Sequence, residues 1–270
     1  MEIRIEPSGM QELSGIYLPV RNARAAIIMV HGLGEHIGRY EWVARFFNEN
    51  GYSFIGLDLP GHGKSPGKKG HIKDFNLYDN MIDAVSDYLM EKEDSVPMVI
   101  YGHSLGGVIA LRYLLAKDNI SSGIITAPWL KLNYEPPKIK MLLASIVSRI
   151  WPSFIQSSGL NPRDISSDSR VVDEYISDPL VHSSISANLF FSATHNAESL
   201  LNCKDEFHTP ILLMNGGSDR IMSVKGSEII AANNTMAEIK IWEGGFHELH
   251  NEVFREKVME YILLWLDKRL

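Results

Sequence analysis

The sequence contains a single cysteine, Cys203, among its 270 residues. An internal disulfide is therefore excluded, and nothing in the chain requires an oxidising compartment. We expect Cys203 to act as a small, partly buried apolar side chain. The chain also lacks an apolar run of the roughly 20 residues that a membrane-spanning helix needs. Residues 1–6 alternate apolar and charged side chains, unlike a signal peptide, so we expect a cytoplasmic protein.

Positive charge is not in excess either. The 26 lysines and arginines are outnumbered by 33 aspartates and glutamates, which gives a net charge of −7. Proteins that bind nucleic acid need a basic surface to neutralise phosphates, so no nucleic-acid partner is expected. Hydrophobic residues make up 45% of the chain. That share is enough for one large core, or for one core with an inserted subdomain.

Short apolar runs alternate with amphipathic stretches along most of the chain. This alternation predicts an α/β fold in which helices flank a mostly parallel sheet on both faces. After two N-terminal strands, further strands are expected at 26–30, 53–57, 98–101, 123–126, 211–215 and 238–242. Helices are expected at 40–50, 77–92, 105–116, 224–232 and 252–266.

The alternation breaks between Pro128 and Thr209, where about eighty residues contain no clear strand, too many for a loop in a compact domain. We therefore predict a helical cap at 129–205, inserted between two parts of the core at 1–128 and 206–270. Residues 138–151 place apolar side chains at helical spacing. Two interpretations remain open for this helix, an ordinary packed helix or a lid that contacts lipid. A local excess of positive charge favours the lid.

Gly102-His103-Ser104-Leu105-Gly106 lies directly between the predicted strand 98–101 and the predicted helix 105–116. A G-x-S-x-G sequence in this position is typical of a nucleophile elbow, which presents a serine to a histidine base and to backbone N–H donors. The flanking glycines suit such a turn because a Cβ would collide with the neighbouring elements. We predict that Ser104 is a catalytic nucleophile.

In this architecture the partners of the serine follow in the order acid, then histidine, each on a loop after a strand. His247 follows the last predicted strand through a glycine-rich turn, and Asp219 follows the strand at 211–215. Asp205 precedes that strand and so lies at the wrong end of it. We predict that His247 is the base and that Asp219 accepts its Nδ1 proton. Two interpretations stay open for His250: a position at the surface or at the start of the last helix, or a role in the pocket.

An oxyanion hole needs two backbone N–H groups. One is expected from Leu105, the residue after the nucleophile, and the other from Leu33 in the glycine-rich loop after the strand at 26–30. His31 and His103 lie beside tight turns. We expect both to be packed, hydrogen-bonded structural residues.

Three patterns resemble nucleotide or metal sites but fail on spacing. Gly-Lys-Ser at 63–65 matches the end of a P-loop, yet Asp58 stands where the first glycine belongs and Pro66 prevents the following helix. Residues 32–38 have one residue too many for a dinucleotide fingerprint. Residues 247–250 are one residue short of the zinc-binding H-E-x-x-H. We therefore expect no cofactor and no metal.

Together these motifs resemble those of the monoacylglycerol lipase and lysophospholipase family of α/β-hydrolases. The similar segments are 31–36 with Arg39-Tyr40, Asp58 with 61–65 and 70–71, 102–107, Tyr175 with 177–180, 218–220, and 243–244 with 247–250. The resemblance covers nearly the whole chain.

This resemblance implies an α/β-hydrolase with a helical cap and the triad Ser104, Asp219 and His247. The implied activity is hydrolysis of carboxylic esters of single-chain lipids, monoacylglycerols or lysophospholipids. The resemblance also implies that Arg39, Tyr175 and His250 approach the alcohol end of the substrate. At position 105 relatives often have methionine, and a leucine there leaves the backbone donor in place.

Other functions stay open at this point. Another serine hydrolase with a cap, such as an aminopeptidase or a C–C hydrolase, would keep the triad and change the pocket. A relative that binds ligands without catalysis would share the fold. The apolar cap and the absence of an obvious acidic cluster favour a lipid ester, with transient contact between the cap and a membrane or lipid surface. Acyl length, head group and oligomeric state are not fixed by the sequence.

Overall fold

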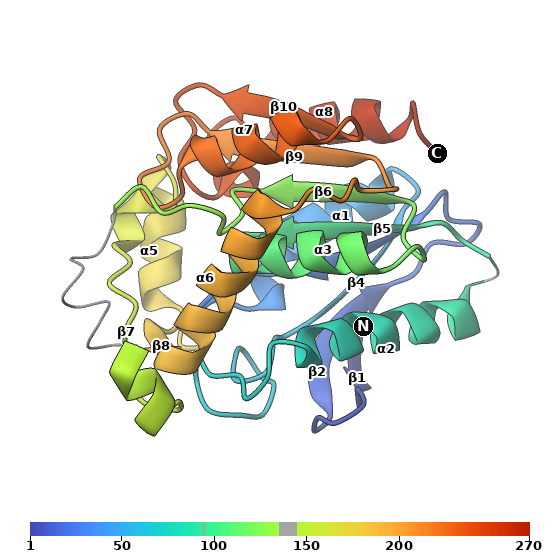
Figure 1. Cartoon of the computed structure of the whole chain (residues 1–270). Helices are drawn as coiled ribbons and strands as arrows, with labels where there is room; N and C mark the ends of the chain where they lie inside the picture. The colour runs from blue at the N-terminus through green and yellow to red at the C-terminus, as the bar shows by residue number, and fades with distance from the viewer. Residues whose placement is uncertain (94, 135–144) are drawn as a thin grey trace.

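The computed structural model describes residues 1–93, 95–134 and 145–270. One eight-stranded sheet runs through the molecule in the order β1-β2-β4-β3-β5-β6-β9-β10 (Figure 1). β1 and β2 are antiparallel to their neighbours, and all pairs from β4 to β10 are parallel. These strands are β1 (Glu2–Ile5), β2 (Leu13–Leu18), β3 (Ala26–Val30), β4 (Ser53–Leu57), β5 (Met98–His103), β6 (Ser122–Thr126), β9 (Ile211–Gly216) and β10 (Ala237–Trp242).

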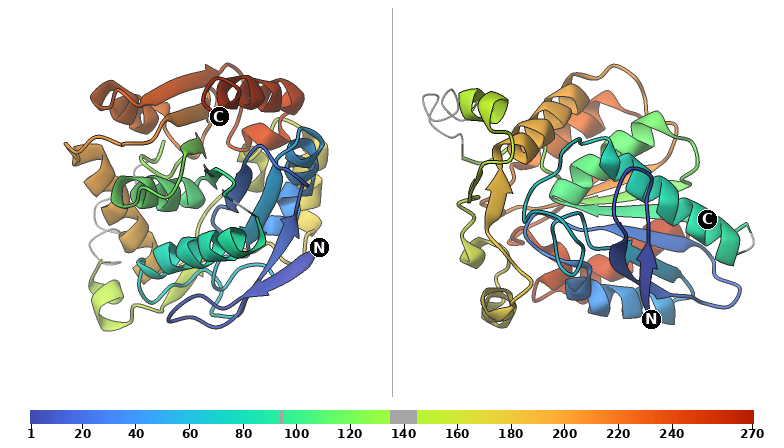
Figure 2. Two further views of the ribbon diagram at one scale, coloured as in Figure 1. Left: turned by 90° about the vertical axis from the view of Figure 1, so that its right-hand side faces the viewer. Right: turned by 90° about the horizontal axis from the view of Figure 1, so that it is seen from below.

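Helices cover both faces of this sheet (Figures 1 and 2). One face carries α1 (Glu41–Glu49) and α8 (Arg255–Leu266), and the other carries α2 (Leu77–Lys92), α3 (Leu105–Ala116), α6 (Ala187–Asn202) and α7 (Val224–Asn233). Side chains of a strand alternate between faces. Ile27 and Met29 of β3 accordingly pack towards α1 and α8, whereas Ile28 and Val30 pack in the core on the other side.

The predicted fold class is confirmed. The strands expected at 26–30 and 53–57 and the helices expected at 77–92 and 105–116 are found with the same bounds. A parallel strand buried on both faces reads as a continuous apolar run, and every residue of β3 and β4 is buried. None of the helices in the described ranges is long and apolar enough to cross a membrane.

The chain leaves the sheet after β6 and returns to it at β9. In between lie β7 (Ile155–Ser157) paired with β8 (Ser184–Ser186), and α5 (Ser169–Ser177), beyond the carboxyl ends of the parallel strands (Figure 1). Residues 145–150 are helical, whereas 138–144 of the predicted cap helix lie outside the described residues. We propose that residues 129–205 form the cap predicted from the sequence. Its last helix, α6, packs against α3 and α7 in the helical layer of the core.

Candidate active site

Ser104 lies at a sharp turn between β5 and α3. Its φ of 53° and ψ of −114° place it in a backbone region that costs a residue other than glycine about 1–3 kcal/mol. The flanking glycines are required by close packing. A Cβ on Gly106 would lie 2.0 Å from the carbonyl oxygen of Val30, and one on Gly102 would lie 2.5 Å from that of Gly106. The G-x-S-x-G sequence therefore forms the strained turn that a nucleophile elbow needs.

His247 and Asp219 form a buried hydrogen-bonded pair. Nδ1 of His247 lies 2.8 Å from Oδ2 of Asp219. The other carboxylate oxygen, Oδ1, accepts the backbone N–H groups of Ile221 at 2.7 Å and Met222 at 3.0 Å. Because both carboxylate oxygens are engaged, Asp219 is held in one orientation and fixes the histidine ring, which leaves Nε2 as the atom able to accept a proton.

The surroundings raise the pKa of His247 above its ordinary value of 6.5. Burial alone would lower the pKa, but the negative charge of Asp219 and its hydrogen bond outweigh burial. Glu248 and Glu35 raise it further. The pair thus stabilises the imidazolium that forms when His247 takes a proton.

The predicted base lies beside the residue that precedes the predicted nucleophile, at the carboxyl edge of the sheet. The ring of His103 lies 4.8 Å from that of His247, measured between ring centroids, and His103 directly precedes Ser104. The Nδ1 atom of His103 is hydrogen-bonded to Oγ1 of Thr126 at 3.0 Å, and His31 is hydrogen-bonded through both ring nitrogens. His31 and His103 are both buried, so the prediction that these two histidines are packed and hydrogen-bonded is confirmed.

The amides of Leu33 and Leu105 are available as oxyanion donors. Leu105 is the first residue of α3, so its N–H has no acceptor within the helix. Neither amide has a hydrogen-bond acceptor within residues 1–93, 95–134 and 145–270. Gly32 lets the Leu33 loop approach the nucleophile, because a Cβ there would lie 3.2 Å from Cβ of Ser104. This arrangement suits the predicted oxyanion hole.

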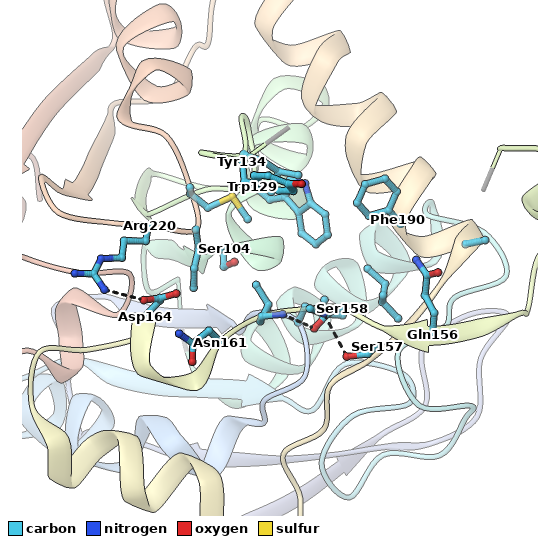
Figure 3. A pocket seen from close by; sticks show the side chains of 18 of the residues that line it. Ser104, Trp129, Tyr134, Gln156, Ser157, Ser158, Asn161, Asp164, Phe190 and Arg220 are labelled. Carbon is cyan, nitrogen blue, oxygen red and sulfur yellow. Dashed lines mark hydrogen bonds and ion pairs between the residues drawn. The ribbon is translucent and has the colours of Figure 1, made fainter. Parts of the chain in front are cut away.

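Ser104 and Leu33 line a cavity of about 800 Å³ (Figure 3). Its walls are mostly apolar and come from the cap, from the segment after β6, and from the loop after β9. The apolar lining includes Trp129, Val147, Phe154, Ile185, Phe190 and Met222. A mostly apolar cavity that also contains polar groups is typical of a ligand-binding site.

Arg39, Tyr175 and His250 lie elsewhere, and none of them lines this cavity. Arg39 forms two hydrogen bonds of 2.7 Å with the carboxylate of Glu248, and its guanidinium carbon lies 4.7 Å from the ring centroid of Tyr175. The ring of His250 is fully buried and stacks on Tyr40 at 4.7 Å between centroids. Burial lowers the pKa of His250 to about 4. The structure thus places the three residues in a buried polar cluster next to the triad, and their predicted contact with the alcohol remains a prediction.

Two acidic residues of this cluster were not among the predicted site residues. Glu35 accepts the N–H of Gly32 at 2.6 Å through Oε1 and an N–H of Arg39 at 2.8 Å through Oε2. Burial raises the pKa of Glu35. Burial also acts to raise the pKa of Glu248, but the paired guanidinium of Arg39 lowers it to about 2. Each of these glutamates lies within two residues of a predicted site residue, Leu33 or His247, and that adjacency was the signal in the sequence.

Among the described residues, no group of three or more histidine, cysteine, aspartate or glutamate side chains is placed to hold a metal ion.

The family follows from comparison with known proteins. Residues 21–253 match the family described as serine aminopeptidase, S33. The chain belongs to this S33 family. The resemblance to monoacylglycerol lipases and the α/β-hydrolase fold are confirmed as well.

Relatives of this S33 member include lipases by name. Human monoglyceride lipase is 30% identical over 93% of this chain and 85% of its own length. An uncharacterized abhydrolase domain-containing protein of Dictyostelium discoideum is 36% identical over 91% of this chain, which spans only 26% of that longer protein. The crystal structure of Paleococcus ferrophilus monoacylglycerol lipase is 32% identical, covers 96% of this chain and 100% of its own, and has a TM-score of 0.88.

Proposed function

We propose that the protein is a serine esterase that hydrolyses carboxylic esters of single-chain lipids, monoacylglycerols first among them. The observation that carries this proposal is the position of Ser104, on a strained elbow in the wall of a largely apolar cavity. The buried pair of His247 and Asp219 lies at the same edge of the sheet. The names of the human and Paleococcus ferrophilus relatives agree with this substrate class.

The reaction proceeds through an acyl-enzyme. Nε2 of His247 accepts the proton of Ser104 as Oγ attacks the ester carbonyl carbon, and the N–H groups of Leu33 and Leu105 stabilise the resulting oxyanion. The imidazolium, stabilised by Asp219, gives this proton to the departing alcohol oxygen, and the acyl group stays on Ser104. A water molecule then gives a proton to His247 as it attacks the acyl carbon. The imidazolium passes this proton to Oγ of Ser104 as the acyl–Oγ bond breaks, which releases the fatty acid and restores the serine hydroxyl.

The size of the cavity favours one acyl chain. At about 800 Å³ it lies within the range of pockets that enclose one small ligand. A monoacylglycerol or lysophospholipid places its one chain inside. A triacylglycerol would leave two chains outside, so we expect it to be a poor substrate.

Peptide substrates fit this cavity less well. An aminopeptidase needs an unpaired carboxylate to receive the ammonium group of its substrate. Among the described residues, Asp164 is the one carboxylate that lines the cavity, and it is already paired with Arg220 at 3.2 Å. This pairing favours an ester substrate over an amino-terminal one.

We further infer that the cap makes transient contact with a lipid surface. Ile150 and Trp151, at the end of the helix over 145–150, are 80% and 58% exposed, and Ile146 is 47% exposed. Grouped exposed apolar side chains are typical of surfaces that meet a membrane or a partner. They lie on or next to the helix that carries Val147, which lines the cavity, so contact with a lipid surface would bring the cavity close to its substrate.

A substrate panel tests the proposal. The panel comprises monodecanoylglycerol, a decanoyl lysophospholipid, tridecanoylglycerol, p-nitrophenyl butyrate and an aminoacyl p-nitroanilide. We expect the wild type to cleave the single-chain esters, and Ser104→Ala to lower kcat by at least about a thousandfold with an unchanged circular dichroism spectrum. A fluorophosphonate probe should label the wild type alone. Residual activity above about a tenth, more than loss of even one oxyanion donor leaves, or cleavage of the anilide alone, would contradict the proposal.

A further inference from the structure

His247 is held by contacts on both sides of it in the chain. The N–H group of Phe246 donates to Oε1 of Glu252 at 2.8 Å, and the N–H group of Glu248 donates to the carbonyl oxygen of Ile165 at 2.7 Å. Glu252 follows the loop after β10, whereas Ile165 belongs to the cap. The two amides that flank the proposed base are therefore fixed by groups outside the loop that carries it.

Glu252 also connects this loop to the cap. Its Oε1 atom accepts the backbone N–H of Ser167 at 3.1 Å as well, and its Oε2 atom accepts the hydroxyl of the same serine. Oγ of Ser166 in turn donates to the carbonyl oxygen of Asn251 at 2.9 Å. Cap residues 165–167 thus lie alongside the chain after β10, and the carboxylate of Glu252 lies between the two segments.

The carboxylate of Glu252 is buried and receives three neutral donors. The residue is 1% exposed, and its donors are two peptide N–H groups and one hydroxyl. A buried carboxylate destabilises a fold unless hydrogen bonds replace its hydration, and these three donors do so. Because Oε1 meets two amides from different segments, the contact depends on how far the side chain reaches.

The loop needs such anchors because its own sequence leaves its backbone free to move. Gly244 and Gly245 precede Phe246, and Gly244 has a φ of 75°. Glycine loses more conformational freedom on folding than any other residue. Nδ1 of His247 lies 2.8 Å from Oδ2 of Asp219, and in the proposed reaction Nε2 has to reach the serine at the same time. A small shift of the backbone before the histidine would change both contacts.

We propose that Glu252 is a positioning residue for the base of the esterase proposed above, on which this step rests. It holds the backbone at Phe246 against the cap and so sets the place of the His247 ring between Asp219 and Ser104. It acts through the geometry of its hydrogen bonds and not through its charge. The cap thereby helps to align the triad in addition to lining the cavity.

Two substitutions that change the side chain little separate geometry from charge. Glu252→Asp keeps the charge but shortens the side chain by one methylene, so its carboxylate cannot reach both amides at once. Glu252→Gln removes the charge but keeps the reach, because Oε1 can still accept both amides and the new N–H can donate to the hydroxyl of Ser167. A positioning role predicts that only the first variant is impaired, and a charge effect predicts the reverse.

The first readout is the separation of kcat from KM for p-nitrophenyl butyrate. We expect Glu252→Asp to lower kcat by about tenfold to a hundredfold, as a small misplacement of a catalytic group does. Its KM should stay close to the wild-type value, since the base contributes to the transition state and not to substrate binding. Glu252→Gln should keep both wild-type values.

The second readout is the hydrogen bond between His247 and Asp219 itself. A longer contact would weaken the interaction that raises the pKa of His247, so in Glu252→Asp the acidic midpoint of kcat/KM should move to lower pH. Glu248 and Glu35, which also raise this pKa, are unchanged in the variant. The proton NMR resonance of the Nδ1–H group should shift in Glu252→Asp and stay in place in Glu252→Gln. A role confined to stability would move neither signal.

Matched controls come from α8. Glu260 is an exposed residue of this helix, so Glu260→Asp and Glu260→Gln make the same chemical changes away from the loop and should keep the wild-type kcat and midpoint. Circular dichroism and urea unfolding verify that each variant is folded. Should Glu252→Asp fail to fold, Ser167→Ala replaces it and should lower kcat by about threefold with a midpoint at lower pH, since one of three hydrogen bonds is lost.

The outcomes distinguish this proposal from the proposed function. If the wild type does not cleave p-nitrophenyl butyrate, the esterase function is wrong. If it does, a wild-type kcat or an unmoved midpoint in Glu252→Asp overturns the positioning role alone, and so does an equal impairment in Glu252→Gln. The same criteria apply to Ser167→Ala where it replaces the aspartate substitution.

Discussion

Arg39 and Glu248 are joined by two parallel hydrogen bonds of 2.7 Å inside the protein. Glu248 directly follows the proposed base His247, and Arg39 also donates to Glu35, which accepts an N–H from the loop of the proposed oxyanion donor. One buried cation therefore ties the loop after β3 to the loop after β10. The contacts that hold these loops lie outside the cavity.

Loss of the positive charge of Arg39 should lower the free energy of unfolding. Arg39→Ala leaves the carboxylates of Glu35 and Glu248 buried without a positively charged partner, so we expect the free energy of unfolding to fall by about 3–5 kcal/mol. Arg45→Ala is the control, because Arg45 pairs with Glu41 on the exposed surface, where an ion pair contributes about 0.5 kcal/mol. Urea unfolding at neutral pH measures both. Similar small losses in the two variants would show that the buried cluster does not stabilise the fold.

The acidic limb of the pH profile should report the pair formed by His247 and Asp219. His247 acts as a base only when neutral, so kcat/KM should fall as the pH drops through its pKa, with a midpoint above 6.5 because that pKa is raised. In Asp219→Asn the raising charge is lost while burial remains. The midpoint should move to lower pH, and kcat should fall by about 10⁴-fold.

The control for this experiment is Asp205→Asn, at an exposed position before β9. Its kcat and the pH midpoint of its kcat/KM should equal those of the wild type, with p-nitrophenyl butyrate as the substrate for all three proteins. A harmless Asp219→Asn together with a severe Asp205→Asn would mean that the acid of the triad is misassigned.

Gly34 should be sensitive to any side chain. Its φ is 78°, and a Cβ there would lie 2.2 Å from the carbonyl oxygen of His182 in the cap. Gly34→Ala should therefore displace the neighbouring Leu33 amide and lower kcat for a short ester by about tenfold to a hundredfold, as partial loss of an oxyanion donor would. Gly9→Ala has nearly the same φ, 76°, but its nearest contact is an ordinary 3.5 Å. Its kcat should be unchanged, and equal effects in both variants would refute the proposed role of the loop.

The helix over 145–150 allows chain binding to be separated from surface contact. Val147 lines the cavity, whereas Ile150 is exposed. Val147→Asp should raise KM for decanoyl esters far more than for butyryl esters, since apolar contact contributes about 0.8 kcal/mol per buried CH₂. Ile150→Asp should lower turnover of monoacylglycerol in vesicles but not of monomeric butyrate. Equal losses on long and short esters for Val147→Asp would show that the helix is only structural.

The core of the fold could be predicted because its signals are local. β3 is a continuous apolar run, and α3 begins at the G-x-S-x-G motif, so both were predicted with their bounds. The sequence did not predict the individual strands and helices of the cap. β7 and β8 have three residues each and pair across a long separation, Ile155 with Ser186, and so short a strand carries no periodicity. Half of the predicted cap helix, residues 138–144, lies outside the described residues.

In the site, the order of motifs along the chain was sufficient to select Asp219 and His247, which the structure places in contact. The sequence did not reveal the surroundings of Arg39. Its main partner, Glu248, is 209 residues away, and no local pattern reports such a pairing. The contact of Asp164 with Arg220 in the cavity wall was also not predicted, because Asp164 belongs to a short helical turn of the cap and meets Arg220 only after folding.

The strained backbone at Ser104 lowers the thermal stability of the protein, yet the serine at this position is needed for activity. Glycine adopts a φ of 53° without a steric penalty, so Ser104→Gly would release about 1–3 kcal/mol of strain and remove the nucleophile in the same step. A screen for thermal tolerance alone would therefore enrich inactive variants at this position. Engineering of a more robust form has to retain the serine deliberately and seek its gains at sites remote from the elbow.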